Sequence, residues 1–197
     1  MRVVTRQAAG LAPGGWTADT RRHVRGFFDD LAAEWHTRTS PQRAAVVGDA
    51  LARGLDALVL PAGPAVEIGS GTGAYSGLLA ERFATVMAVD LSLEMRRRAP
   101  ARPAHRVQAD AARLPVRDRS AAAIVLINMF LFPAEIDRVL SPGGALVWVN
   151  SSGEQTPIHL SPDDLVAALP GAWTGVWSRA GEGLWCVLRR SSEGGAS

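Results

Sequence analysis

The chain has 197 residues, of which 47% are apolar, and this is enough to bury the core of one compact domain. Its formal charge is only +2, and a balance so close to neutral does not predict a nucleic-acid-binding protein. All 21 basic residues are arginine, so mechanisms that need a lysine nucleophile or a lysine Schiff base are excluded.

The chain carries one cysteine, Cys186, in an apolar run, so a disulfide within the chain and a cluster of thiolate metal ligands are both excluded. The first seven residues lack the apolar core of a signal peptide. The longest apolar run, residues 121–134, contains Asn128 and Pro133 and is too short to cross a bilayer. These features predict a cytoplasmic protein with no membrane partner.

Residues 1–60 are predicted to form an N-terminal helical cap that belongs to the same domain as the rest of the chain. Residues 1–15 are rich in Gly, Ala and Pro and are expected to be loose. Trp16–Arg38 is predicted to be a helix capped by Thr17 or Asp19, because its apolar residues recur at helical spacing. A second helix is expected over Ser40–Gly54, with its first residue as the cap.

Residues 61–190 alternate between strand-like and helix-like segments, which is typical of an α/β domain with a parallel sheet. The continuous apolar character of the fourth strand predicts a central strand that is covered on both faces. Residues 191–197 are expected to be a disordered tail. The predicted strands are residues 65–68, 85–89, 105–108, 122–128 and 145–150, followed by a hairpin of 173–178 and 184–190.

The most informative stretch is Glu67-Ile68-Gly69-Ser70-Gly71-Thr72-Gly73, which lies between an apolar run and a helix-forming run. Three glycines at every second position let the backbone pass close to a ligand and adopt conformations that a side chain would forbid. The helix that follows offers free N–H groups and the positive end of its dipole. The turn is therefore expected to bind a ligand with a negative or strongly polar end.

An acidic residue, Asp90, follows at the tip of the second strand, seventeen residues after Gly73. A carboxylate in this position would hold the ribose hydroxyls of either NAD or S-adenosylmethionine (SAM). Two further acids favour SAM. Glu67, two residues before the first glycine, suits the α-ammonium of a methionine moiety and would repel a pyrophosphate. Asp110, at the end of the third strand, is placed to accept a hydrogen bond from an adenine amino group.

The turn Pro142-Gly143-Gly144 before the fifth strand completes a set of motifs that occur in a fixed order. From Pro64 to Asn150 the chain closely resembles a class I SAM-dependent methyltransferase of the small, single-domain, type-11-like family. The resemblance implies a three-layer Rossmann-like fold, with a mostly parallel seven-stranded sheet, an antiparallel last strand and an N-terminal helical cap. It also implies SAM as cofactor, S-adenosylhomocysteine (SAH) as product and no metal.

The segment Phe28–Trp35 is similar to the N-terminal helix that folds over the cofactor in many small-molecule methyltransferases. By this resemblance Trp35 would wall the methionine arm, and Arg38 would pair with its carboxylate, with Arg43 and Arg53 as rivals for that pairing. The end of the fourth strand corresponds to the position beside the transferable methyl group. The cofactor-binding residues implied are Trp35, Arg38, Glu67, Gly69, Ser70, Gly71, Gly73, Asp90, Leu91, Asp110, Ala111 and Asn128.

The acceptor is expected to be a small molecule, methylated by direct in-line displacement. His36, His159 and Glu154 are the candidates for a general base, which is needed only if the acceptor arrives protonated. Two alternatives stay open: a methyltransferase that acts on RNA or protein, and a protein that binds SAM or SAH without catalysis. An NAD oxidoreductase is disfavoured because Glu67 opposes a pyrophosphate. The chain is expected to be a monomer or a homodimer.

Overall fold

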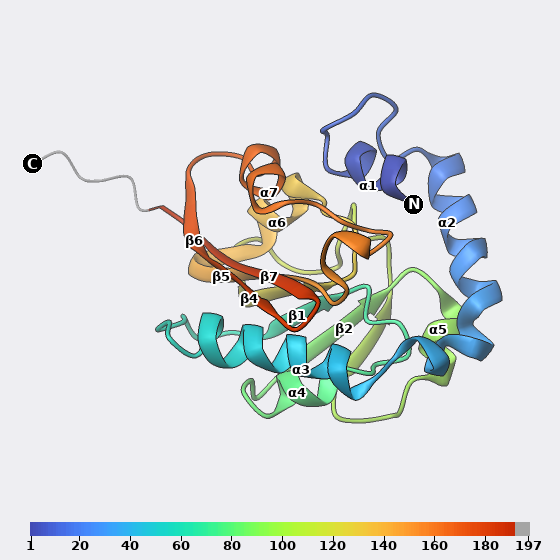
Figure 1. Cartoon of the computed structure of the whole chain (residues 1–197), viewed down its shortest axis with the longest axis horizontal. Helices are drawn as coiled ribbons and strands as arrows, with labels where there is room; N and C mark the ends of the chain where they lie inside the picture. The colour runs from blue at the N-terminus through green and yellow to red at the C-terminus, as the bar shows by residue number, and fades with distance from the viewer. Residues whose placement is uncertain (192–197) are drawn as a thin grey trace, which may run out of the picture.

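A seven-stranded sheet in the order β3-β2-β1-β4-β5-β7-β6 forms the centre of the computed structural model, which describes residues 1–191 (Figure 1). Strands β1 to β5 pair in parallel, while β7 is antiparallel to both β5 and β6. The predicted fold class is therefore confirmed, including the antiparallel last strand. The strands are β1 (Ala65–Ile68), β2 (Val86–Asp90), β3 (His105–Gln108), β4 (Ala121–Ile127), β5 (Leu140–Asn150), β6 (Trp173–Ala180) and β7 (Gly183–Arg190).

The central strand β4 is buried along its whole length, as its continuous apolar sequence predicts. Side chains of a strand alternate between the two faces of the sheet. Ile124 and Leu126 accordingly join the core cluster that contains Trp148, and Ala123 and Val125 join the cluster on the other face. A sheet covered on both faces in this way explains why β4 needs no polar residue until it ends.

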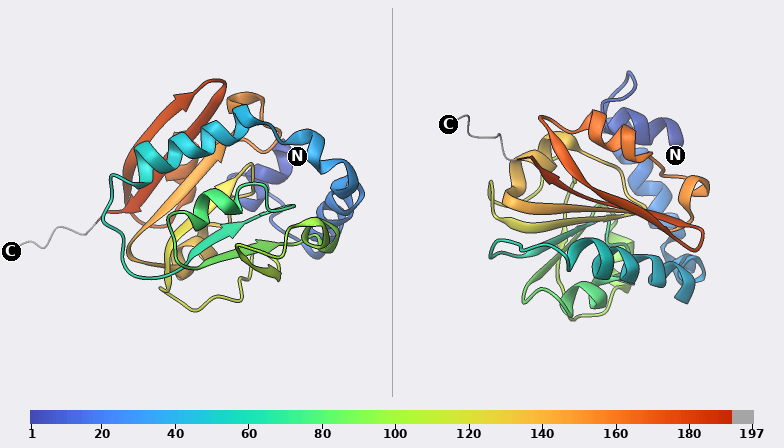
Figure 2. Two further views of the ribbon diagram at one scale, coloured as in Figure 1. Left: turned by 90° about the horizontal axis from the view of Figure 1, so that it is seen from below. Right: turned by 60° about the vertical axis from the view of Figure 1, so that its left-hand side comes forward.

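Helices cover both faces of the sheet and one of its edges (Figures 1 and 2). On one face lie α3 (Pro41–Asp49), its π-helical continuation η2 (Ala50–Leu55) and α4 (Ser76–Ala80). On the other face lie α1 (Arg2–Ala8), α6 (Pro133–Val139) and α7 (Pro162–Ala168). The carboxyl edge of the sheet is flanked by α2 (Ala18–Leu31), the 3₁₀ helix η1 (Ala32–Arg38), α5 (Leu93–Arg98) and the short η3 (Gly153–Gln155).

The helix starts follow from capping residues that the sequence makes visible. The side chains of Thr17, Ser40, Ser92 and Ser161 each accept a hydrogen bond from a backbone N–H in the first turn of α2, α3, α5 and α7. Such caps satisfy N–H groups that have no partner within the helix. The predicted helix over Trp16–Arg38 differs in one respect, because its regular part ends at Leu31 and the remainder is 3₁₀.

The prediction that residues 1–15 are loose is wrong, because this segment includes helix α1 and packs on the core. Thr5 is fully buried, and its hydroxyl donates to the carbonyl of Met1 at 3.0 Å. Val4, Ala8 and Leu11 pack against the core cluster of the α6–α7 face. Composition suggested a flexible end, but apolar residues at helical spacing bury enough surface to order it.

Strand β5 begins earlier than predicted, at Leu140 rather than at residue 145. Leu140 pairs with Ala121, and the pairing then shifts so that Ala123 faces Ala145. The tight turn predicted around Gly143 is thus a bulge within the strand, and Gly143 adopts a φ of 76°. The predicted disordered tail, apart from Ser191, lies outside the described residues.

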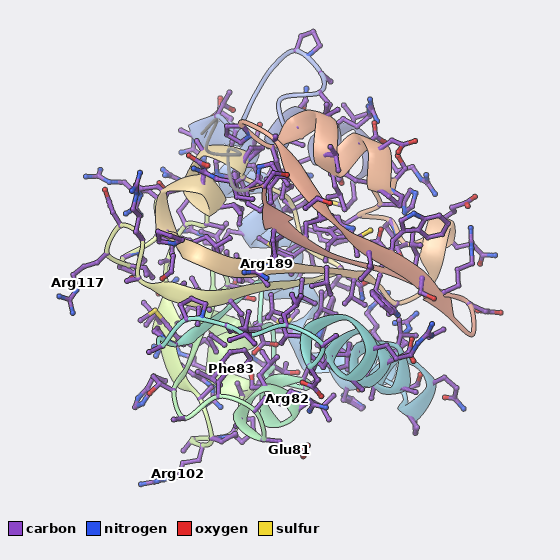
Figure 3. The ribbon with its side chains drawn as sticks, turned by 90° about the vertical axis from the view of Figure 1, so that its left-hand side faces the viewer. Glu81, Arg82, Phe83, Arg102, Arg117 and Arg189 are labelled. Carbon is purple, nitrogen blue, oxygen red and sulfur yellow. The ribbon has the colours of Figure 1, made fainter. Side chains whose placement is uncertain are left out.

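The edge of the sheet opposite α2 carries the loops that precede β3 and β4. Figure 3 views the molecule from this side, and the side chains of Arg102 and Arg117 project outward from these loops. In the described part of the chain, no helix has both the length and the apolarity needed to cross a membrane.

Candidate cofactor-binding site

A cavity of about 270 Å³ lies at the carboxyl edge of the sheet, between the ends of β1, β2 and β4 and the segment α2–η1. Strand order reverses between β1 and β4, and open α/β sheets bind ligands at such a switch point. All the cofactor-binding residues predicted from the sequence except Glu67 and Gly73 line this cavity: Trp35, Arg38, Gly69, Ser70, Gly71, Asp90, Leu91, Asp110, Ala111 and Asn128.

The glycine turn forms the floor of the cavity and has a backbone that other residues rarely adopt. Gly69, Gly71 and Gly73 have φ values of 72°, 54° and 76°. The N–H groups of Gly69 and Ser70 both donate to the carbonyl of Val89, which ties the turn to β2. A Cβ on Gly71 would lie 3.3 Å from Nε1 of Trp35, so the absence of a side chain lets η1 close over the turn.

Asp90 joins the glycine turn to the start of α5. One carboxylate oxygen accepts from the N–H of Gly71 at 2.7 Å, and the other accepts from the N–H of Ser92 at 2.7 Å. Burial raises the pKa of Asp90, and these hydrogen bonds act against that rise. Each carboxylate oxygen has a second lone pair, so the group can still accept from two hydroxyls of a ligand.

Asp110 is held by a residue that the sequence did not identify, Trp16. The indole N–H of Trp16 donates to the Asp110 carboxylate at 3.0 Å, and Arg21 forms an ion pair with the same group at 3.3 Å. The Trp16 ring packs against Phe130 and Phe132, with centroids 5.7 and 5.1 Å apart. The N-terminal segment therefore closes one end of the cavity. No local signal indicates this contact, since 94 residues separate Trp16 from Asp110.

The segment α2–η1 forms an aromatic wall, as the resemblance implied. The rings of Phe28 and Trp35 meet edge to face at 5.7 Å. Asp29, which was not among the predicted site residues, accepts from the hydroxyl of Ser92 and, at 3.3 Å, from the N–H of Glu94. This carboxylate at the N-terminus of α5 holds the wall in place over the cavity.

Of the three arginines considered as partners of the methionine carboxylate, two line the cavity and one does not. Arg38 and Arg43 line the cavity, and Arg43 donates to the backbone carbonyl of Arg38. Arg53 instead pairs with Asp49 at 3.1 Å and donates to Ser178 at 3.2 Å, outside the cavity lining. Two guanidinium groups are therefore available to anions in the cavity.

Glu67 lies beneath the glycine turn rather than on the cavity wall. It is 2% exposed, and its carboxylate accepts a hydrogen bond from the hydroxyl of Ser76. Burial raises the pKa of Glu67 to about 7, with a smaller contribution from the charge of Asp90. Gly73 is also off the wall and faces Ala99 and Pro100.

The raised pKa of Glu67 predicts a pH-dependent stability. Between about pH 4.5 and pH 7 the folded protein retains a proton on Glu67 that the unfolded chain releases. The free energy of unfolding should therefore fall as the pH rises through this window, by about 3 kcal/mol from this group, and level off above it. Glu67→Gln keeps an oxygen for Ser76 but does not titrate, so it should lack this fall. Urea unfolding of both proteins at pH 5 and pH 8 measures the difference, and equal pH slopes would contradict the assignment.

None of the three predicted bases is part of the cavity lining formed by residues 1–191. His36 is exposed on η1. His159 lies with Nδ1 2.8 Å from the Oδ1 atom of Asn150, and burial lowers its pKa. Glu154 is exposed and pairs with Arg179 at 2.9 Å. The structure thus gathers the predicted cofactor-binding residues but does not bring the candidate bases to them.

Asn128 occupies the point where β4 ends and the cavity turns toward the loop after β5. It has a φ of 51°, a left-handed conformation that Asn tolerates better than most residues. Its amide donates to the Ser151 hydroxyl at 2.9 Å, and its carbonyl accepts from the Ser151 N–H at 2.8 Å. These bonds fix both the amide orientation and the wall beyond it, which includes Thr156.

Comparisons with known proteins agree with this geometry. Residues 66–148 match the family described as a methyltransferase domain. Malonyl-[acyl-carrier protein] O-methyltransferase of Marinomonas sp. (strain MWYL1) is 37% identical over 106 residues, which cover 47% of this chain. The match spans only 39% of the length of that curated relative.

Solved structures show the same fold at low sequence identity. The DhpI–SAH complex superimposes with a TM-score of 0.68 at 20% identity, covering 88% of this chain and 98% of the other. A SAM-dependent methyltransferase from Aquifex aeolicus gives a TM-score of 0.62 at 14% identity, covering 80% and 97%. The match over residues 66–148, the strand order and the glycine turn all agree with the fold of class I, Rossmann-like SAM-dependent methyltransferases.

Proposed function

We propose that the chain transfers the methyl group of SAM to a nucleophilic atom of a small-molecule acceptor. One observation carries this proposal: the glycine turn, Asp90 and Asp110 converge on one cavity at the switch point of the sheet. Two carboxylates and a glycine backbone form a donor and acceptor pattern that suits an adenosine moiety. The sulfonium of bound SAM supplies an already activated methyl carbon.

Different residues of the cavity would bind different parts of SAM. Asp90 would accept from the two ribose hydroxyls, and Asp110 from the adenine amino group. Arg38 would pair with the methionine carboxylate, and Trp35 would cover the methionine arm. Asn128 lies at the turn toward the acceptor. Alignment of the reacting atoms by such contacts can supply ~7–11 kcal/mol of the barrier reduction in favourable systems.

A small acceptor is supported by the shape and charge of the surface. Pro157 and Ile158, next to Thr156, add an apolar part to the cavity lining that suits a small organic molecule. The curated relative is named as a malonyl-[acyl-carrier protein] O-methyltransferase, which supports an oxygen of an acyl group as the acceptor atom. Three consecutive arginines, Arg96–Arg98, end α5 and could dock RNA, but they are partly neutralised because Arg97 and Arg98 both pair with Glu94 at 2.7 Å. A cytoplasmic location is part of the proposal, since a reducing compartment suits the buried free thiol of Cys186.

Calorimetric titration with SAM, SAH and NADH tests the cofactor assignment. We expect SAM and SAH to bind with dissociation constants on the order of micromolar, which correspond to a binding free energy of about −8 kcal/mol. NADH should not bind. Binding of NADH alone would overturn the assignment, as would binding of none of the three. SAM binding without methyl transfer to any of a panel of metabolites would favour the alternative of a binding protein without catalysis.

A further inference from the structure

The wall of the cavity beyond Asn128 offers hydrogen-bond donors to a ligand. The Ser151 hydroxyl accepts from the Asn128 amide at 2.9 Å, and the Thr156 hydroxyl accepts from the N–H of Ser152 at 3.2 Å. Each hydroxyl oxygen thus serves as an acceptor inside the protein. Its own O–H hydrogen has no acceptor among residues 1–191 and stays available. Ser151 and Thr156 are 5% and 3% exposed, so a ligand there would be largely shielded from water.

Two arginines line the cavity, and the single carboxylate of the cofactor needs only one of them as a partner. Arg38 is assigned to the methionine carboxylate, which leaves Arg43 without an anionic partner in the cavity. Its contact with the Arg38 carbonyl fixes the guanidinium at the wall while leaving other N–H groups free. An anion entering a largely apolar cavity needs such a partner to offset the loss of hydration.

The three candidate bases lie outside the cavity lining of the described residues, and burial raises the pKa of Tyr75, the phenol that lines the cavity, so that it keeps its proton at neutral pH. Asn150 orients His159 through Nδ1, Glu154 pairs with Arg179, and His36 is exposed on η1. A hydroxyl or ammonium acceptor would need one of them within hydrogen-bond reach. A carboxylate needs none, because its pKa of about 4 leaves it ionised at neutral pH.

We infer that the methyl acceptor is a carboxylate, bound by the hydroxyls of Ser151 and Thr156 with Arg43 as its countercharge. This inference rests on the proposed function and adds the class of acceptor. A lone pair of one carboxylate oxygen forms the new O–CH₃ bond while the S–CH₃ bond breaks, and its electron pair stays on the sulfur. The products are a neutral methyl ester and SAH. No proton is released, so the step balances without a base.

Ternary binding to the protein–SAH complex tests this inference. The probes are hexanoate, hexanamide and hexylamine, which share an apolar tail and differ in charge and in hydrogen-bonding pattern. Calorimetry should show that hexanoate binds at least ~10-fold more tightly than either of the others. This ratio is the change in affinity expected from about one charge-assisted hydrogen bond. Equal binding of the three, preference for hexylamine, or no binding of hexanoate to the SAH complex would overturn the carboxylate. Failure of SAH itself to bind would instead contradict the proposed function.

A matched pair of variants assigns the countercharge. Arg43→Gln should lower the affinity for hexanoate at least ~10-fold and leave the affinity for SAH within about threefold. Arg117→Gln is the control, because Arg117 projects from the opposite edge of the molecule (Figure 3) and should change neither affinity. Unchanged hexanoate binding in Arg43→Gln would remove Arg43 from the site. If the Thr156 hydroxyl donates to the carboxylate, Thr156→Val should weaken the binding of hexanoate by a factor similar to that of Arg43→Gln. The same variant should leave the binding of hexanamide unchanged. Equal losses of affinity for both ligands would exclude that role.

Discussion

Asp90→Ala should raise the dissociation constant for SAM and SAH by at least ~100-fold. The Asp90 carboxylate lines the cavity and is the group assigned to the ribose hydroxyls. Two charge-assisted hydrogen bonds contribute roughly 1.5–3 kcal/mol each, and about 3 kcal/mol corresponds to a 100-fold change in affinity. The same carboxylate also holds the N–H groups of Gly71 and Ser92 at 2.7 Å, so its removal loosens the turn as well. Calorimetric titration with SAH measures the change directly.

A matched control separates binding from folding. Asp163 is an exposed carboxylate in the first turn of α7, and Asp163→Ala should leave SAH affinity unchanged. Asp90→Asn keeps one acceptor oxygen and the size of the side chain, so it should bind SAH more tightly than Asp90→Ala and less tightly than the parent protein. Circular dichroism must show that each variant is folded. Near-normal affinity in a folded Asp90→Ala protein would refute the ribose assignment.

The sequence was most informative where structure depends on neighbours along the chain. The strands over 65–68 and 105–108 match the structure, and the caps Thr17 and Ser40 lie where predicted. These features depend on local patterns of apolar residues and on single hydrogen bonds within one turn. The carboxyl ends of parallel strands meet at one edge, so the placement of Asp90 beside the glycine turn also follows from local information.

The sequence was least informative where a residue's surroundings come from distant parts of the chain. Trp16 reaches Asp110 across 94 residues, and no pattern near either residue indicates the contact. Glu67 was expected beside the ligand, yet β1 turns its side chain beneath the glycine turn, toward Ser76. His159 was predicted as a candidate base, but its Nδ1 atom lies 2.8 Å from Oδ1 of Asn150, outside the cavity lining, and burial lowers its pKa. Burial and hydrogen bonding set these roles, and both require the fold.

The N-terminal segment shows how composition can mislead about a site. Gly, Ala and Pro suggested a loose end, while the structure uses α1 and Trp16 to close the cavity. Arg6 adds an ion pair with Asp164 at 3.1 Å, which joins α1 to α7. Helical spacing of apolar residues predicted the helix α2, and the resemblance of Phe28–Trp35 to other methyltransferases implied the aromatic wall. Closure by the preceding fifteen residues was not predicted, since it depends on a surface that only the folded core provides.

Gly71→Val should abolish detectable binding of SAM and SAH while leaving the fold in place. Gly71 has a φ of 54°, and a Cβ there would lie 3.3 Å from the Trp35 indole nitrogen. The two methyl groups of valine would extend into the cavity that Gly71 and Trp35 line together. A β-branched residue at positive φ also strains the backbone by ~1–3 kcal/mol, which should lower the melting temperature by ~2–10 °C. Thermal unfolding with and without SAH measures both effects, since a protein that binds SAH is stabilised by it.

Gly77→Ala provides the matched control for this steric and backbone effect. Gly77 lies in α4, one turn beyond the glycine turn, and apart from its chain neighbours and the backbone of its own helix no heavy atom of residues 1–191 comes within 4 Å of the Cβ it would gain. Alanine in a helix is favoured over glycine by roughly 0.5–1 kcal/mol, so this variant should melt slightly higher and bind SAH normally. Gly71→Ala should lie between the two, because it adds one carbon at a strained φ. Equal SAH binding in Gly71→Val and Gly77→Ala would mean that the cofactor does not pass over Gly71. The residues assigned to the adenosine and methionine moieties would then be wrong.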